Sequence, residues 1–493
     1  MNLLLFITIP LLTAVAVLLS RNTQQVRWIS LVGSAVQLAM AVALLFLFRT
    51  ETASGNTGQM LFERQYNLFP TWHITFHLGV DGISIAMILL TAFVVIAGVL
   101  VSWNIKKMTK EFYFLLILLG LGAYGFFMSI DLFVLFFFLE ISVIPKYLLI
   151  GIWGSGKKEY SANKLALMLM GGSALILVGV LGLYFSTPDH SFDLLKLSRL
   201  NIPIETQRII FPLLFVGFGV FTALFPFHTW VPDGHSSAPT AGSMFLAGIT
   251  MKLGGYGCLR VATYLMPDAA KEYSTIIIVL ASVAILYGAF ATMMQKDLKY
   301  INAYSSVSHC GFVLLGIGML TTTAMTGAVM QMVSHGLMTA LFFAVIGMIY
   351  DRTHTRVVAE MGGLMKVMPF ITTILFIVGL CSLGLPGLSG FVAEVTIFMG
   401  SWEKPDIFYR IATIAACMSI VVTAVYILRA IGQVAMGPIK NEGYLQLKDA
   451  TWNEKLAAII LVIGIVAIGV APFWLNDLIR SATEIIMNKL TSK

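Results

Sequence analysis

Six ionisable side chains lie within segments of the sequence that are otherwise apolar, and these residues could carry out chemistry. They are two glutamates, two lysines and two histidines: Glu140, Lys146, Lys252, His309, His335 and Glu394. A charged group inside a bilayer is unfavourable, so such residues face a bundle interior or a hydrated cavity and are functional by default. All three residue types can gain and lose a proton. The set therefore predicts a chain of protonatable sites.

Neighbouring charges can control such sites without a redox centre. A unit charge about 6 Å away changes the energy of a buried charge by about 3 kcal/mol at an effective dielectric constant of about 20. The sequence contains no haem-attachment motif, cysteine cluster or dinucleotide-binding loop, so we expect no cofactor in this chain. Its four cysteines lie singly in apolar segments, and neither histidine has a second ligand at helical spacing, so no metal site is expected.

Each of the six residues also has a structural interpretation. A buried carboxylate or lysine can form a structural ion pair or reach the interface from a helix end, and a single buried histidine is commonly a hydrogen-bonded core residue. Ser308 and Ser334 stand next to His309 and His335, which suits a path that carries water. Six such residues spread over several helices favour a proton path over independent structural roles.

The segments that must position these residues are membrane helices. Hydrophobic residues make up 58% of the 493 positions and charged residues 11%, and apolar runs of about 20 residues, enough to cross a bilayer, recur along the chain. We predict an all-α polytopic membrane protein with 14 transmembrane helices, near 2–20, 28–48, 79–102, 112–129, 131–151, 163–185, 208–228, 238–265, 275–294, 300–319, 324–349, 367–400, 408–434 and 456–476. The longer loops are 49–78, 186–207 and 435–455.

Two of the predicted spans, helices 7 and 12, are interrupted. Helix 7 runs into "LFPFHTWVPDGHSSAPTAG", and helix 12 contains "CSLGLPGLSGFVAE", whose prolines and glycines break a long helix. Broken helices in corresponding positions predict two inverted five-helix repeats, residues 112–265 and 275–434, within a single membrane domain, 1–493. Ordinary proline kinks in unrelated helices are the alternative.

The positions of Lys and Arg predict the orientation. The odd-numbered loops carry most of the cations, for example Lys106, Lys107 and Lys110, so these loops are expected in the cytoplasm and both termini on the non-cytoplasmic side. The cations behind the net charge of +7 lie at the ends of apolar runs, so the lipid bilayer is the expected partner and no nucleic acid is. We interpret the N-terminal apolar stretch as the first helix.

Four stretches closely resemble one family over nearly the whole chain. They are "FPFHTWVPDGHSSAPTAGSMFLAGITMKLGGYG", "QKDLKYINAYSSVSHCGFVLLG", "QMVSHGLMTALFFAVIGMIYDR" and "LGLPGLSGFVAE". They are similar to the antiporter-like subunits of complex I, the proton-translocating NADH:quinone oxidoreductase, and to their Mrp antiporter relatives. The resemblance implies proton translocation in a bacterial inner membrane, coupled to redox chemistry in distant subunits. It also implies other membrane-arm subunits, including neighbouring antiporter-like chains, as partners.

The resemblance also assigns roles to residues. It implies that Glu140, Lys252 and Glu394 carry the proton path and that His309 and His335 connect it. Glutamate rather than lysine after the second break is typical of the chain M branch, the homologue of mitochondrial subunit 4. His228, at the first break, is expected to be a structural anchor.

One position departs from the family. The lysine that relatives carry seven residues before His228 is replaced here by Phe221, while Lys146 stands where relatives have an uncharged residue. We hypothesise that Lys146 reaches from helix 5 into the volume of the missing ammonium. The two residues Glu140 and Lys146 lie about 9 Å apart along a helix and about 120° apart around it, so Pro145 or the flexible stem must close the gap. The alternative is a lysine that snorkels to the cytoplasmic headgroups.

Two other functions stay open. One is an Mrp-type cation/proton antiporter, which Glu394 disfavours, or the antiporter-like subunit of a membrane-bound hydrogenase. The other is a passive scaffold of the membrane arm, which the loss of the helix 7 lysine keeps open and the retained Glu140, Lys252 and Glu394 disfavour. The expected function is that of a non-redox subunit of a proton-translocating NADH:quinone oxidoreductase.

Overall fold

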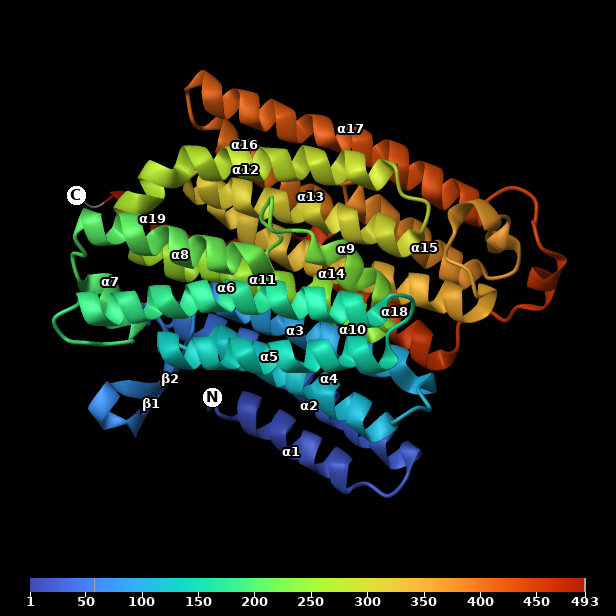
Figure 1. Cartoon of the computed structure of the whole chain (residues 1–493), viewed down its shortest axis with the longest axis horizontal. Helices are drawn as coiled ribbons and strands as arrows, with labels where there is room; N and C mark the ends of the chain where they lie inside the picture. Colours follow the sequence, from blue (N-terminus) through green and yellow to red (C-terminus); the bar gives the residue numbers. More distant parts are fainter. Residues whose placement is uncertain (57, 492–493) are drawn as a thin grey trace.

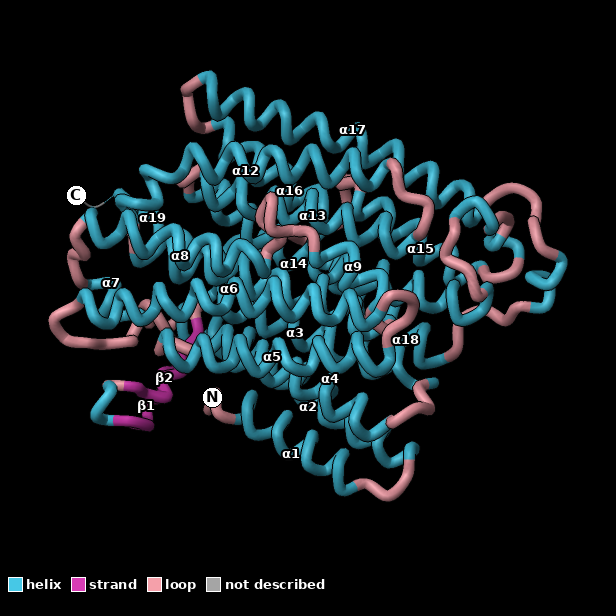
Figure 2. Tube along the Cα trace, in the orientation of Figure 1, coloured by secondary structure: helices cyan, strands magenta, loops and turns pink. Residues whose placement is uncertain are grey.

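The fold is a bundle of membrane helices, as predicted. A computed structural model describes residues 1–56 and 58–491, and nearly all of the chain is helical (Figure 2). Each predicted span corresponds to one helix or to an interrupted series of helices. By length and composition, 10 helices of the described residues could cross a membrane. The all-α polytopic fold class is confirmed.

The first half of the chain contains the first interruption. Its helices are α1 (Leu5–Leu19), α2 (Thr23–Ala53), α3 (Gly82–Val101), α4 (Thr109–Met128), α5 (Leu132–Trp153), α6 (Lys158–Ser186), α7 (Leu194–Arg199), α8 (Ile204–Phe221), α9 (Trp230–Ser237), α10 (Thr240–Phe245) and α11 (Met251–Gly257). Two π-helical stretches, Leu246–Thr250 and Cys258–Thr263, flank α11. The predicted helix 7, 208–228, therefore corresponds to α8 and the break that follows it, and α9 lies beyond its predicted end.

The second half contains the second interruption. Its helices are α12 (Pro267–Met293), α13 (Leu298–Gly318), α14 (Thr322–Thr353), α15 (Pro369–Ser382), α16 (Ser389–Trp402), α17 (Ile407–Ala435), α18 (Trp452–Val470) and α19 (Phe473–Thr491). The predicted helix 12 is the pair α15 and α16. Short 3-10 turns lie at Pro70–Trp72, Ser102–Asn104, Val358–Glu360, Leu364–Lys366 and Glu442–Gln446.

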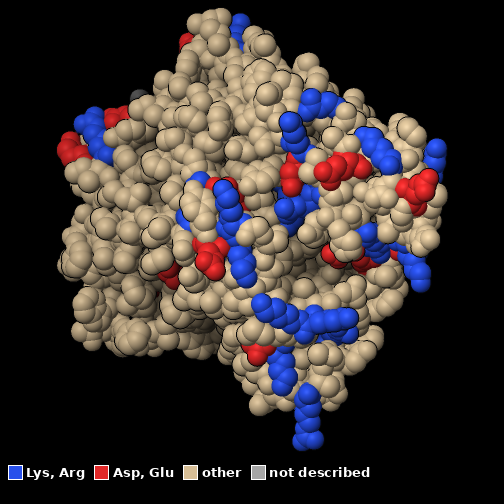
Figure 3. Space-filling model, turned by 45° about the vertical axis from the view of Figure 1, so that its right-hand side comes forward, with Lys and Arg blue, Asp and Glu red and all other residues tan. Residues whose placement is uncertain are grey.

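Helices α3 and α14 form the centre of the bundle. Almost every residue of both helices is buried, and α14 packs against α3, α10, α13, α15, α16, α18 and α19. Helix α1 lies at one edge and α17 at the opposite edge, and both termini lie toward the left-hand end in Figure 1. Lys and Arg gather at the other end, while much of the remaining surface in Figure 3 carries no charge. This distribution is typical of a protein surrounded by lipid.

Two elements were not predicted from the sequence. The expected loop 49–78 contains most of an antiparallel hairpin of β1 (Leu61–Phe69) and β2 (Ile74–Val80). The segment after residue 476, for which no element is predicted, is most of α19, whose buried side chains recur at helical spacing: Leu475, Leu478, Ile479, Ala482, Ile486 and Leu490. A search for long apolar runs overlooks both, because each element is apolar on one side only.

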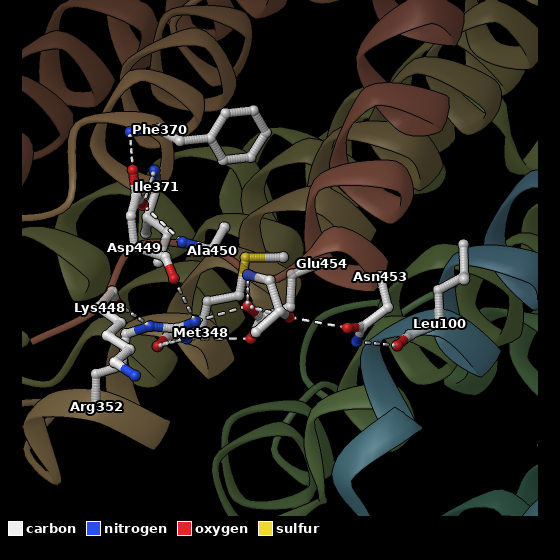
Figure 4. Close-up of polar contacts among 11 residues, drawn as sticks. Leu100, Met348, Arg352, Phe370, Ile371, Lys448, Asp449, Ala450, Asn453 and Glu454 are labelled. Atoms are coloured by element: carbon white, nitrogen blue, oxygen red, sulfur yellow. Dashed lines mark hydrogen bonds and ion pairs between the residues drawn. The ribbon is translucent and has the colours of Figure 1, made fainter. Parts of the chain in front are cut away.

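A polar brace holds the charged end of the bundle together (Figure 4). Arg352, at the end of α14, forms an ion pair with Glu454 of α18, with its Nη2 2.7 Å from Oε2. Asp449 accepts hydrogen bonds from the backbone N–H groups of Phe370 and Ile371, which begin α15. Asn453 donates from its side chain to the carbonyl oxygen of Leu100 in α3. The ends of α3, α14, α15 and α18 are thereby fixed relative to one another.

At the other end, His77 joins the hairpin to the loop before α7. Its Nδ1 lies 2.7 Å from Asp193 Oδ2, and its Nε2 lies 3.1 Å from Glu63 Oε2. Burial acts to lower the pKa of His77, but hydrogen bonds and charges from the two carboxylates outweigh it, so the pKa is raised. Burial likewise acts to raise the pKa of Asp193, but hydrogen bonds from His77 and from the backbone N–H of Lys196, together with the charges of both residues, outweigh it, so that pKa is lowered.

The His77–Asp193 contact should make hairpin stability depend on pH. Because the pKa of His77 is raised from 6.5, its stabilisation is fully present below 6.5 and is lost as pH rises through the raised value. Because the pKa of Asp193 is lowered, its stabilisation is lost as pH falls through that value. We expect hydrogen–deuterium exchange in β1 and β2, corrected for intrinsic rates, to accelerate as pH rises through the raised pKa.

His77→Gln should remove this pH dependence. His73→Gln is the matched control, because His73 is exposed on the same hairpin and its ring contacts backbone carbonyls rather than carboxylates. Equal pH dependence in the wild type and in His77→Gln would contradict the assignment.

Candidate functional site

Lys252 lies at the centre of the candidate site. It belongs to α11, a short α-helical stretch between two π-helical ones, and π-helical segments occur frequently at functional sites. Its side chain is only 1% exposed. The ammonium donates a hydrogen bond to the carbonyl oxygen of Ala247 at 2.6 Å and lies 2.8 Å from Nδ1 of His335. No carboxylate of the described residues forms an ion pair with it.

Glycines allow the surrounding helices to approach Lys252. A Cβ at Gly254 would lie 2.4 Å from the carbonyl oxygen of Phe218 in α8, and one at Gly255 would lie 2.6 Å from Sδ of Met332 in α14. Helices that pack closely through small residues exclude lipid from the polar side chain between them. Lys252 therefore faces the interior of the bundle.

From Lys252 a line of protonatable side chains continues into the second half of the chain. The rings of His335 and His309, from α14 and α13, lie 5.2 Å apart between centroids. Nδ1 of His309 lies 3.4 Å from Oε1 of Glu394 in α16. Gln331 and Ser382 also contact the ring of His309, at 3.3 and 3.2 Å. The structure thus brings together four of the six predicted site residues.

The second break makes room for the carboxylate of Glu394. Gly384 and Gly387 adopt φ values of +76° and +93°, which favour glycine. A Cβ at Gly384 would also lie 2.8 Å from Oε2 of Glu394, so a side chain there would collide with the carboxylate. The interruption between α15 and α16 therefore positions both Glu394 and Ser382, which contact His309 from its two sides.

Several polar atoms along this line have no hydrogen-bond partner among the described residues. They include Nε2 of His335 and Oε1 of Gln331, and both atoms are buried. Buried polar groups in proteins are ordinarily satisfied by protein or by ordered water. Because Nδ1 of His335 faces the ammonium of Lys252, the proton of a neutral His335 ring belongs on Nε2. That nitrogen is therefore free to pass on a proton.

Lys146 points into the bundle. Its side chain is 2% exposed, its Nζ donates a hydrogen bond to Oγ of Ser142 at 3.0 Å, and it lies 6.0 Å from the ring centroid of Phe221. The alternative of a lysine that snorkels to the headgroups is therefore wrong. The ammonium lies against the residue that replaces the expected lysine of helix 7. The next residue in the chain, Thr222, packs directly against Gly254 of α11, because a Cβ at Gly254 would collide with it. Phe221 therefore lies between Lys146 and the part of the chain that contacts α11.

Glu140 is the sixth predicted residue and lies at the edge of the bundle. It is partly buried, and its Oε1 has no hydrogen-bond partner among the described residues. Neither Glu140 nor Lys146 makes a described hydrogen bond to Lys252. The structure therefore separates the six residues into a connected group of four and a pair on α5.

Two further buried groups were not predicted as site residues. His235 in α9 is fully buried, its ring lies 5.1 Å from that of Phe343, and neither ring nitrogen has a described partner. The stretch "HTWVPDGH" contains two histidines, and a role was predicted only for His228. His228 itself packs against Phe225 and Tyr287, as expected of an anchor. The second group is Arg260, which forms a buried ion pair with Asp81.

Within residues 1–56 and 58–491, no group of three or more His, Cys, Asp or Glu side chains is placed to hold a metal ion. Interrupted helices and a buried line of Lys, His and Glu define an antiporter-like membrane protein.

Comparison with known proteins agrees with this class. The family model described as "NADH:quinone oxidoreductase/Mrp antiporter, TM" matches residues 129–419. The chain belongs to this family. A NADH-quinone oxidoreductase subunit M from Rickettsia typhi is 34% identical over 497 residues, covering 98% of each chain. A NAD(P)H-quinone oxidoreductase chain 4-2 from Synechocystis is 38% identical over 437 residues, covering 87% of this chain and 77% of that protein. The expected resemblance to the chain M branch is confirmed.

Solved structures show the same fold. A chain of respiratory complex I from Thermus thermophilus superimposes with a TM-score of 0.89 at 24% identity, covering 100% of both chains. A chain of the Mrp complex from Dietzia superimposes with a TM-score of 0.86 at 19% identity, covering 99% of both.

The close approach of α8 and α11 at Lys252 can be tested through Gly254. Gly254→Ala places a Cβ against the backbone of Phe218 and should destabilise the protein by about 1–3 kcal/mol, because the backbone must shift. The measurement is the thermal stability of the purified complex. Gly171→Ala in α6 is the matched control, since no atom lies within 4 Å of its Cβ position. Equal stability of the two variants would show that α8 and α11 are not tightly packed there.

Proposed function

We propose that this chain is a proton-translocating, non-redox subunit of an NADH:quinone oxidoreductase, of the subunit M type. The observation that carries the proposal is the 2.8 Å approach of Lys252 Nζ to His335 Nδ1, continued through His309 to Glu394. The names of the Rickettsia and Synechocystis relatives support the assignment to this complex. Other membrane-arm chains are the partners, and redox chemistry belongs to other subunits.

The geometry supports a stepwise transfer. The Lys252 ammonium gives a proton to Nδ1 of His335, and His335 releases the proton on Nε2 toward His309. His309 then passes a proton from Nδ1 to the carboxylate of Glu394, which releases it onward. The proton left on Nδ1 of His335 returns to Nε2 by a change of tautomer, and the neutral Lys252 amine takes up a new proton. A change of charge near Lys252 would drive these steps, because a unit charge about 6 Å from the ammonium changes its energy by about 3 kcal/mol.

The proposal includes the place of the chain in the cell. It is a multi-pass protein of the bacterial inner membrane, with both termini and the hairpin on the non-cytoplasmic side. The concentration of Lys and Arg at the end opposite the termini supports this orientation (Figure 3). An Mrp-type antiporter is the competing function, which the same fold could serve, and Glu394 argues against it. A passive scaffold is disfavoured by the contacts along the Lys252 line.

Lys252→Met tests the proposal in the complete complex reconstituted in liposomes. Without the ammonium, His335 loses its proton donor. The rate of proton pumping coupled to NADH oxidation should therefore fall at least about tenfold. Lys271→Met is the matched control, because Lys271 is a solvent-exposed lysine on α12. Unchanged proton pumping by Lys252→Met would contradict the proposal.

The role of Lys146 can be tested by moving its charge. We propose that this ammonium serves the first half of the proton path in place of the lysine missing at Phe221. Lys146→Met should lower proton pumping without destabilising the fold, because the charge of Glu140 acts on Lys146 but forms no ion pair with it within 4 Å among the described residues. The double variant Lys146→Met/Phe221→Lys should restore most of the pumping, since the two side chains are in contact.

The rescue distinguishes relocation from a structural role. Phe221→Lys alone, which adds a second ammonium beside Lys146, serves as the control for the new lysine. Full pumping by Lys146→Met, or no rescue in the double variant, would remove Lys146 from the mechanism.

A further inference from the structure

A stripe of large polar side chains runs from Lys252 toward the end of the molecule that carries both termini. Tyr256, Arg260 and Tyr264 follow Lys252 at intervals of four residues, and all three are buried. Residues four apart lie on one face of a helix. Along the helix the stripe meets Asp81, just before α3, and Gln59, neither of which belongs to the His335–Glu394 line, so it is a second polar route from the same ammonium.

Hydrogen bonds continue this route to the surface. The Tyr256 hydroxyl lies 3.1 Å from Oγ of Ser84, at the start of α3, and the N–H of Ser84 donates to Asp81 at 2.9 Å. Farther along, Tyr264 accepts a hydrogen bond from the partly exposed side chain of Gln59. Hydroxyl groups both donate and accept, so a row of them can pass protons. Unobstructed, this route would connect Lys252 to the face of the termini.

Arg260 stands in the middle of the route. Its guanidinium donates to Asp81 and lies 5.9 Å from the ring centroid of Tyr256. A guanidinium has five N–H donors, no acceptor, and stays protonated in proteins. It therefore cannot accept a proton that arrives from Tyr256. Its Nε is buried and has no described partner, so the group is not fully used by the ion pair.

We propose that Arg260, held by Asp81, is a barrier that closes Lys252 to protons from the face of the termini. The inference rests on the proposed function, because a barrier has meaning only if Lys252 carries protons. Asp81 fixes the barrier from another helix: it caps α3 through Ser84 and binds Arg260 with its second oxygen. A purely structural ion pair between α3 and the π-helical stretch is the competing role.

A leak measurement separates the two roles. The complete complex is reconstituted in liposomes, a pH gradient is imposed without NADH, and its decay is followed with a pH-sensitive dye. In Arg260→Gln/Asp81→Asn both side chains are neutral, both can donate and accept, and Asn still caps a helix. We expect the gradient to decay at least about tenfold faster, the change that lowering a barrier by about 1.4 kcal/mol gives.

Two controls locate the leak. Arg260→Lys keeps a cation that the charge of Asp81 holds protonated, so it should hold the gradient as the wild type does. Adding Lys252→Met to the neutral pair should abolish the leak, because the route begins at Lys252. A wild-type rate of decay in the neutral pair, or a leak that survives Lys252→Met, would overturn the proposal. If the neutral pair does not assemble, Arg260→Gln alone is measured and judged by the same outcomes.

The design also separates this inference from the proposed function. The leak is measured without electron transfer, whereas the role of Lys252 in pumping is measured with it. Normal pumping by Lys252→Met would refute the proposed function, and an unchanged leak in the neutral pair would refute only the barrier.

Discussion

An ammonium group buried at the centre of a membrane protein, without a carboxylate partner, constrains much of this structure. Transfer of such a charge out of water is unfavourable unless hydrogen bonds and neighbouring groups compensate. Lys252 obtains this compensation from a backbone carbonyl, that of Ala247, and from the imidazole of His335. A carboxylate would hold the proton on the lysine by its charge, whereas an imidazole can take it over. The choice of partner is therefore what makes the site suited to transfer.

The surrounding helices are arranged around this requirement. The π-helical stretches on either side of α11 depart from regular α-helical bonding, and the Ala247 carbonyl that binds Lys252 belongs to the first of them. The glycines of α11 bring α8 and α14 close enough to exclude lipid. The second broken helix supplies Ser382 from one half and Glu394 from the other, so His309 is contacted from both sides of the break. Interrupted helices thus make backbone carbonyl groups available as hydrogen-bond partners inside the membrane. In a continuous helix these groups are already bonded within the helix, and only side chains are available.

The two ends of the bundle differ in how they are held. At the end with most of the Lys and Arg residues, four helices are joined by one ion pair and by hydrogen bonds, made by Arg352, Glu454, Asp449 and Asn453 (Figure 4). At the other end, the hairpin is attached through His77 and Asp193, and Asp81 ties α3 to Arg260. These contacts fix the helix ends, so the buried line between them keeps its spacing. In the proposed function, one end would supply protons to Lys252 and Arg260 would prevent their loss toward the other.

The sequence by itself determined the helical class and the position of both breaks. Long apolar runs and clustered proline and glycine are local signals, and a bilayer leaves few other folds for them. Hydropathy also marked the six ionisable residues of the candidate site, because each is conspicuous in an apolar run. It missed the hairpin and α19, which are apolar on one face only.

Only the tertiary structure decided which of these residues meet. Lys252 and His335 are 83 residues apart in the chain, and no local pattern specifies that distance in space. The inward course of Lys146 toward Phe221 depends on how α5 and α8 pack, since the same side chain could have reached the headgroups. The buried pair of Arg260 and Asp81 likewise joins segments 179 residues apart. Local sequence sets which groups are buried, whereas helix packing sets which of them are close enough to exchange a proton or to block it.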